Sequence, residues 1–128
     1  MGRHALIIED EVLIAFEVQG VLEELGFDTF DLADSPREAL ECARARKPDL
    51  ITADLRIVGG TGLEAVQAIT AALGQIPVVY VTANADMLSG ESVPAVVEKP
   101  IAWPALAAAC HRVCGQAPAT PSLRLEPF

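Results

Sequence analysis

The sequence predicts an α/β protein, a doubly wound five-stranded parallel sheet flanked by five helices. Short apolar runs, too short for helices, alternate with longer segments whose apolar residues recur at helical spacing. Glycines and prolines separate the two kinds of segment. The 128 residues, 52% of them hydrophobic, are enough for one packed domain with a core built from aliphatic side chains.

The first half of the chain alternates strands and helices. We expect a strand at 5–8, a helix at 12–25, a weaker strand at 28–32, a helix from 36 to 47 and a strand at 50–53. Gly26 stands where a helix ends. Ser35 can cap the second helix, Pro36 suits its first turn and Glu38 completes a capping box. Pro48 then ends that helix.

The second half continues the alternation. We expect a loop at 56–61, a helix at 62–73, a strand at 77–81, a short helix within 85–92, a strand at 95–97 and a last helix from about 104 to 115. Such alternation predicts parallel strands joined by right-handed crossovers. The domain would span 1–115. Residues 116–128 hold three prolines without periodicity, which predicts a flexible C-terminal tail.

Polar side chains stand at the carboxyl ends of the predicted strands, where open α/β sheets bind ligands. They are Glu9, Asp10 and Glu11 after the first strand, Asp54 after the third, Thr82 after the fourth and Lys99 after the fifth. Carboxylates crowded together need a cation, and their hard oxygens suit Mg²⁺. Carboxylates also form aspartyl phosphates. Asp54 is therefore a candidate nucleophile, with Mg²⁺, Lys99 and Thr82 holding the phosphoryl oxygens.

These motifs resemble the receiver domain family of two-component signalling, over about residues 3–114. The matching segments are the acids after Leu6-Ile7-Ile8, the Asp54 that ends Leu50-Ile51-Thr52-Ala53-Asp54, the Thr82 after Val79-Tyr80-Val81, and Lys99-Pro100; Gly62 also fits. The resemblance implies a flavodoxin-like receiver fold. It also implies a phosphorylation switch that catalyses only its own phosphorylation and dephosphorylation.

The resemblance assigns roles to particular residues. Asp10 would bind Mg²⁺ directly, and Glu9 would bind it directly or through water. Asp54 would be both metal ligand and phosphoacceptor, and the backbone carbonyl of Arg56 would complete the protein ligands. The peptide bond that follows Lys99 would be cis. The donor would be a histidine kinase, a histidine phosphotransfer protein or a small acyl phosphate, and the output would be changed protein–protein binding.

One position departs from the family pattern. Receivers usually carry an aromatic switch residue three positions before the lysine, and here that residue is Val96. Tyr80 and Trp103 are the candidates to replace it. The segment between Thr82 and Lys99 is also short for the family. These features resemble atypical receivers of alphaproteobacteria, including those attached to general-stress-response regulators.

Two other functions remain open at this level. One is a receiver-like docking module that is not phosphorylated; the intact acceptor, acids and lysine argue against it. The other is a haloacid-dehalogenase-type phosphatase, which also uses Asp, Thr and Lys. Such enzymes carry a second Asp two residues after the nucleophile, where this chain has Arg56, and the chain is short for that class.

Charge, hydropathy and cysteine content limit the kinds of partner that the protein can have. The formal net charge is -9, which repels nucleic-acid backbones. No apolar run is long enough to span a membrane, and the first residues lack a signal-peptide pattern, so we expect a cytoplasmic protein. As a separate expectation, it acts as a monomer or weak homodimer. Cys42, Cys110 and Cys114 are expected to be reduced thiols in small core positions, since they offer too few convergent ligands for a metal site.

Overall fold

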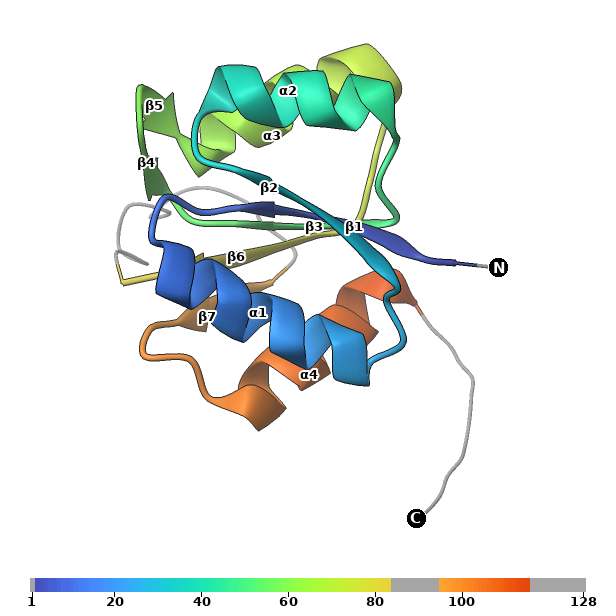
Figure 1. Ribbon diagram of the computed structural model, residues 1–128, viewed down its shortest axis with the longest axis vertical. Helices are drawn as coiled ribbons and strands as arrows, with labels where there is room; N and C mark the ends of the chain where they lie inside the picture. Colours follow the sequence, from blue (N-terminus) through green and yellow to red (C-terminus); the bar gives the residue numbers. More distant parts are fainter. Residues whose placement is uncertain (1, 84–94, 116–128) are drawn as a thin grey trace.

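The described residues, 2–83 and 95–115, are built around a five-stranded parallel sheet, as the sequence predicts (Figure 1). The structure is a computed structural model. The strand order is β2-β1-β3-β6-β7. The strands are β1 (His4–Ile8), β2 (Thr29–Ala33), β3 (Leu50–Ala53), β6 (Val78–Thr82) and β7 (Val96–Glu98).

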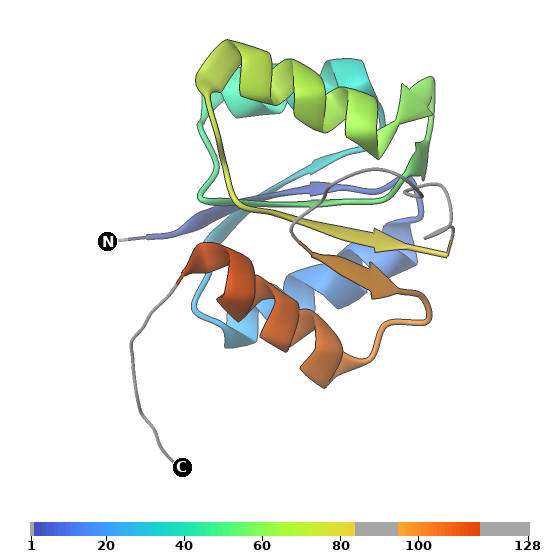
Figure 2. The same ribbon diagram turned by 180° about the vertical axis from the view of Figure 1, so that it is seen from behind.

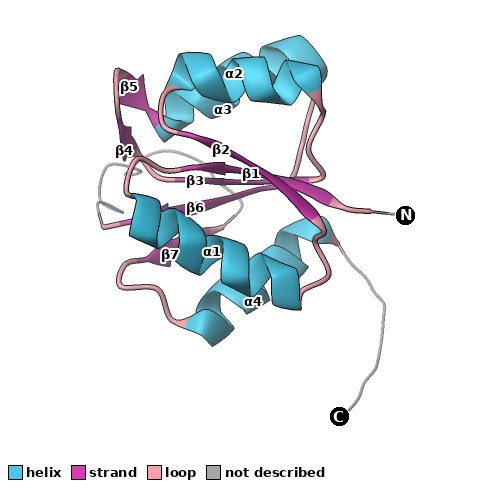
Figure 3. Cartoon of the chain, viewed as in Figure 1, coloured by secondary structure: helices cyan, strands magenta, loops and turns pink. Residues whose placement is uncertain are grey.

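Helices cover both faces of this sheet. Among the described residues, α1 and α4 lie on one face and α2 and α3 on the other, as Figures 1 and 2 show from opposite sides and Figure 3 shows in secondary-structure colours. The helices are α1 (Val12–Glu24), α2 (Pro36–Ala45), α3 (Gly62–Leu73) and α4 (Trp103–Cys114). The fifth predicted helix, at 85–92, lies outside the described residues.

Each face of the sheet carries its own hydrophobic core. Ala5 and Ile7 of β1 belong to the core beneath α1 and α4, whereas Leu6 and Ile8 belong to the core beneath α2 and α3. Burial on both faces explains why β1 is an uninterrupted apolar run rather than an alternating one. With both faces filled by apolar side chains, polar chemistry is left to the ends of the strands.

Helical spacing predicts that Ile14, Val18, Leu22 and Leu25 share the buried face of α1, and the observed face differs slightly. Val18 and Leu22 are buried as predicted, and the small Ala15 joins them. Ile14 and Leu25 are only partly buried and pack at the margin of the same core. Since one turn of helix is 3.6 residues, the buried face of a helix can be inferred from the spacing of apolar residues to within about one position.

Side-chain caps fix the starts of α2 and α3. The Ser35 hydroxyl accepts a hydrogen bond from the Glu38 amide at 3.2 Å, as predicted, but the Glu38 carboxylate accepts from the amide of Asp34 at 2.9 Å, one residue before the expected partner. A complete capping box is found instead at α3, between Thr61 and Glu64. Both caps hold the loops that follow the carboxyl ends of β2 and β3.

The segment predicted as a loop at 56–61 contains a small hairpin. β4 (Arg56–Ile57) pairs with β5 (Gly60–Thr61) in an antiparallel sheet, and Gly59 in the turn has a φ of 76°. Strands of two residues are too short to produce a period in the sequence, so pattern analysis cannot detect them. The hairpin extends the chain directly after Asp54.

The cysteines are free thiols, as expected. Cys110 lies in the core beneath α1 and α4, whereas Cys42 and Cys114 are half-buried. Burial raises the pKa of the Cys110 thiol to about 12, which keeps it protonated at neutral pH. Within the described part of the chain, no cluster of potential metal ligands includes a cysteine.

Two further expectations concern the C-terminal tail and membrane-spanning helices. The tail expected at 116–128 lies outside the described residues. None of the described helices is long and apolar enough to span a membrane.

Candidate functional site

Strand ends bring the predicted site residues together at one edge of the sheet. Glu9 directly follows β1, Asp54 directly follows β3, Thr82 ends β6 and Lys99 follows β7. Parallel strands end on the same side of a sheet, so residues far apart in sequence become neighbours there. Asp54 and Thr82 are 5% and 0% exposed, which places both inside the packed edge rather than on its surface.

Backbone hydrogen bonds extend the sheet beyond the strands and fix two of these residues. The Asp54 amide donates to the Ile8 carbonyl at 2.9 Å, and the Lys99 amide donates to the Thr82 carbonyl at 3.0 Å. The main chain of each functional residue is therefore held by the neighbouring strand. Their side chains start from rigid positions, which favours precise geometry.

The ammonium group of Lys99 is the centre of the site. Its Nζ lies 2.8 Å from Asp54 Oδ2, 3.1 Å from Glu9 Oε1 and 3.1 Å from Glu11 Oε1. The side chains of Lys99, Asp54 and Glu9 are 11%, 7% and 2% exposed, whereas that of Glu11 is 65% exposed. Two buried acids and one exposed acid thus share a single cation.

This arrangement shifts the pKa of both Lys99 and Glu9. Burial alone lowers the pKa of Lys99, but its hydrogen bonds to Asp54, Glu9 and Glu11 outweigh that effect and raise it above the ordinary value. Burial raises the pKa of Glu9 to about 7; the charge of Asp54 adds to the rise, and the Lys99 hydrogen bond opposes it. Lys99 is therefore cationic at neutral pH, while Glu9 is poised between its two forms.

Negative charge exceeds positive charge at this edge. In the described part of the chain, oxygens of Glu9, Glu11 and Asp54 lie within 4.8 Å of one another, and Lys99 supplies a single positive charge among them. Carboxylates at such separations repel one another unless a cation is added or a proton is taken up. The site is therefore electrostatically suited to a further cation or to proton binding.

The chain matches the family described as the response regulator receiver domain over residues 5–110. It belongs to that family. The match covers the whole sheet and most of α4, so all the site residues named above lie inside it. The protein is a receiver of two-component signalling, a signalling module rather than a metabolic enzyme.

Relatives of this receiver include several PhyR proteins. It is 36% identical over 94 residues to the phyllosphere-induced regulator PhyR of Methylorubrum extorquens, covering 71% of this chain and 35% of that protein. The crystal structure of PhyR from Brucella abortus superimposes with a TM-score of 0.79 at 30% identity, covering 89% of this chain and 48% of that one. The PhyR receiver domain of Erythrobacter litoralis gives a TM-score of 0.80 at 28% identity, covering 88% and 89%. The chain thus spans about a third of the curated PhyR.

Glu11, rather than Asp10, joins the acidic cluster of the receiver. Asp10 is exposed and lines a pocket of about 170 Å³ together with Glu9, Asp34 and Glu38. Sequence analysis gave Glu11 no role, although it belongs to the same acidic run. The chain bends at Asp10, and the Glu11 amide donates a hydrogen bond to Glu9 Oε2 at 3.2 Å, which holds these two residues together. The role of Asp10 as a direct metal ligand stays a prediction.

Two other features that the sequence predicts concern the surroundings of Asp54 and Lys99. The Arg56 amide donates a hydrogen bond to Asp54 Oδ1 at 3.4 Å, so the start of β4 contacts the carboxylate. The use of the Arg56 carbonyl as a metal ligand stays a prediction. The peptide bond between Lys99 and Pro100 is cis, which confirms the expectation from the family.

Val96 takes the place of the usual aromatic residue. It is half-buried and pairs in register with Tyr80 of β6, whose side chain is buried in the core beneath α2 and α3. Trp103, the other aromatic candidate, begins α4 and is 49% exposed. An aromatic ring is therefore present beside Val96, but it lies on the neighbouring strand.

The close approach of Gly62 to Asp54 explains why this position is a glycine. A Cβ added to Gly62 would collide with the backbone carbonyl oxygen of Asp54, and the Gly62 amide donates to the Leu55 carbonyl at 3.0 Å. The first turn of α3 therefore packs directly against the main chain of Asp54. Only glycine permits this approach without displacing Asp54.

Replacing Gly62 by alanine should displace the backbone of Asp54 at the end of β3. We expect Gly62→Ala to reduce the free energy of unfolding by about 1–3 kcal/mol, the usual cost of overpacking, measured by urea denaturation. The matched control is Gly20→Ala, because a Cβ there meets no atom within 4 Å. Equal stability of Gly62→Ala and the parent would show that the loop after β3 adjusts freely.

Proposed function

We propose that this receiver accepts a phosphoryl group on Asp54 and signals through changed protein–protein binding. The observation that carries the proposal is the buried Asp54 carboxylate held 2.8 Å from the Lys99 ammonium at the carboxyl edge of the sheet. The neighbouring Glu9 and Thr82 are also buried, so the acceptor lies in a partly dry site where charges act strongly.

The proposed reaction is a displacement at phosphorus. A carboxylate oxygen of Asp54 forms a bond to phosphorus while the P–N bond of a phosphohistidine, or the P–O bond of an acyl phosphate, breaks and the leaving group takes the electron pair. Lys99 is placed to pair with one phosphoryl oxygen, and Thr82 at the adjacent strand end is the residue proposed to donate a hydrogen bond to another.

The acidic cluster fits a hard divalent cation, and Mg²⁺ is the one we propose. Glu9, Asp10, Asp54 and the Arg56 carbonyl would hold it, in keeping with the excess of negative charge at this edge. When bound, the ion would neutralise charge on the transferred phosphoryl group. Glu9, whose pKa is near 7, is the residue in this set for which a proton competes with a cation.

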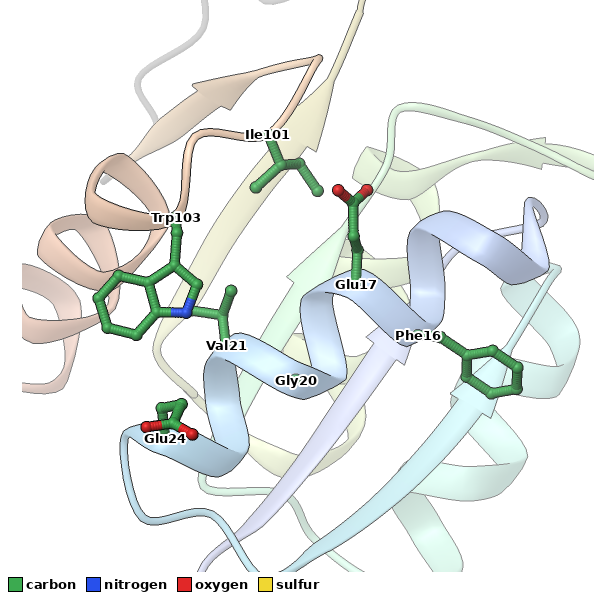
Figure 4. Close-up of a pocket in the computed structure, with 7 residues that line it drawn as sticks. All are labelled: Phe16, Glu17, Gly20, Val21, Glu24, Ile101 and Trp103. Carbon is green, nitrogen blue, oxygen red and sulfur yellow. The ribbon is translucent and has the colours of Figure 1, made fainter.

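A groove beside the site offers a surface for the phosphoryl donor. Its volume is about 540 Å³, and it lies between α1 and the segment that follows Lys99 (Figure 4). The apolar lining comes from Phe16, Gly20, Val21, Ile101 and Trp103, with Glu17 and Glu24 beside it. An exposed tryptophan in an apolar groove is typical of binding surfaces.

Charge and shape indicate the kind of partner. The carboxylates of Glu17 and Glu24 would attract lysine or arginine side chains that flank an apolar helix face. Gly20 lies in the middle of α1, where glycine weakens a helix, and no atom of the described chain lies within 4 Å of the place of its missing Cβ. We propose that a helix of a histidine kinase or phosphotransfer protein approaches α1 closely there.

Phosphorylation of Asp54 can be tested directly. Incubation with acetyl phosphate and Mg²⁺ should add the mass of one phosphoryl group to the intact protein, and Asp54→Asn should abolish the addition. Asp28→Asn is the matched control. Asp28 is exposed, lies far from the site and accepts a hydrogen bond from the backbone amide of Arg3. A parent protein that gains no mass would favour the docking module, and release of phosphate from generic phosphoesters would favour the phosphatase.

The groove makes a separate prediction about stability. Gly20→Ala should raise the free energy of unfolding by up to about 1 kcal/mol, because alanine is the better helix former and the space above it is open. Gly26→Ala should instead lower it, since Gly26 has a φ of 99°. Urea denaturation measures both. No gain from Gly20→Ala would mean that glycine serves the fold itself at this position.

The same groove should govern transfer from a protein but not from a small molecule. Gly20→Gln and Trp103→Ala are expected to slow transfer from a phosphohistidine donor protein by about tenfold or more, since each changes a residue that lines the groove. Both variants should react with acetyl phosphate at the parental rate. Equal losses with both donors would place the defect in the fold or in the site rather than in docking.

A further inference from the structure

The Lys99 ammonium is held by three acidic neighbours. It donates hydrogen bonds to Asp54 at 2.8 Å and to Glu11 at 3.1 Å, and it forms an ion pair with Glu9 at 3.1 Å. An oxygen of a phosphoryl group on Asp54 therefore competes with these contacts for Lys99. The identity of the contact that is released affects how readily the site accepts the group.

The three acids differ in how firmly they hold Lys99. Asp54 is buried at the end of β3, and Glu9 is buried with its second oxygen accepting the Glu11 amide at 3.2 Å. The side chain of Glu11 is 65% exposed, so its carboxylate returns to water when it leaves the ammonium. Release of Glu11 leaves no buried charge without a partner, whereas release of Glu9 does so unless a further cation holds its carboxylate.

The side chain of Glu11 is placed to cap α1 but does not do so. Glu11 is the N-cap residue of α1, where a carboxylate commonly accepts a hydrogen bond from an amide of the first turn. In this structure it makes no such cap bond, and its Oε1 contacts Lys99 instead. The contact with Lys99 therefore replaces a favourable local interaction of the helix.

We propose that Glu11 is a positioning residue that holds Lys99 in the unphosphorylated receiver and competes with the phosphoryl group for its ammonium. This inference rests on the proposed phosphorylation of Asp54 and adds a restraint to it. Glu11 acts through Lys99, not on the reacting atoms. Removing its charge leaves Lys99 with a weaker, neutral acceptor at this position, which an incoming phosphoryl oxygen displaces more readily.

The test compares phosphorylation rates at saturating Mg²⁺. Glu11→Gln should accelerate phosphorylation by acetyl phosphate about two- to fivefold, the size expected for a half-exposed ion pair. Glu98→Gln is the matched control: Glu98 is exposed, adjoins Lys99 in sequence and forms no ion pair with it among the described residues. It removes the same charge and should leave the rate unchanged.

A second donor separates competition for Lys99 from simple repulsion of the donor. Acetyl phosphate carries more negative charge than phosphoramidate. If Glu11 acts through Lys99, Glu11→Gln should accelerate both reactions by the same factor. Acceleration with acetyl phosphate alone would show direct repulsion and overturn the proposal.

Other outcomes are equally decisive. A Glu11→Gln rate equal to or below that of the parent, in a protein with parental unfolding free energy, would overturn the proposal, as would equal acceleration by Glu98→Gln. These results would leave phosphorylation of Asp54 intact. A parent protein that takes no phosphoryl group on Asp54 would instead remove the proposed function, and the role of Glu11 with it.

Discussion

A single ammonium balances two buried carboxylates, and the arrangement of the sheet edge depends on it. Burying Glu9 and Asp54 without a cation would cost several kcal/mol each, because charged groups lose their hydration inside a protein. Lys99 offsets that cost from 2.8 and 3.1 Å. Removing Lys99 would leave two like charges at close range. The pair is therefore maintained only while the Lys99 side chain, which follows β7, reaches across the end of β6 to the ends of β3 and β1.

The strand order provides that proximity. β1 and β3 are hydrogen-bonded neighbours, β6 lies between β3 and β7, and the backbone at Lys99 continues the ladder to Thr82. The two cores fill both faces with apolar side chains, so the polar groups of successive strands gather at one edge. The acidic site is thus a consequence of parallel topology combined with apolar burial: Glu9 and Glu11 follow β1, Asp54 follows β3 and Lys99 follows β7.

The sequence predicts most of this arrangement because the controlling signals are long-range and redundant. Apolar runs define the strands, and the alternation with helices defines their parallel order, which places Asp54 near Lys99. Glu11 was placed at the right strand end, but its contact with Lys99 was not predicted, because the direction of a side chain just beyond a strand depends on local backbone angles that no periodicity reports. The β4–β5 hairpin was missed for a related reason: two-residue strands leave no pattern. The cap by Glu38 was placed one residue too late, since the reach of its flexible side chain decides the partner.

The proposed phosphoryl transfer and the proposed docking share one short segment of the chain. Lys99 contacts Asp54, and Ile101 and Trp103, two and four residues later, line the groove against α1. On the other side, Glu11 contacts the same ammonium and immediately precedes α1, which supplies the opposite wall. A partner that presses on the groove therefore contacts two segments that meet at Lys99. Because the ammonium is held by short contacts to both, small displacements of either wall change its environment, which gives docking a physical route to the acceptor.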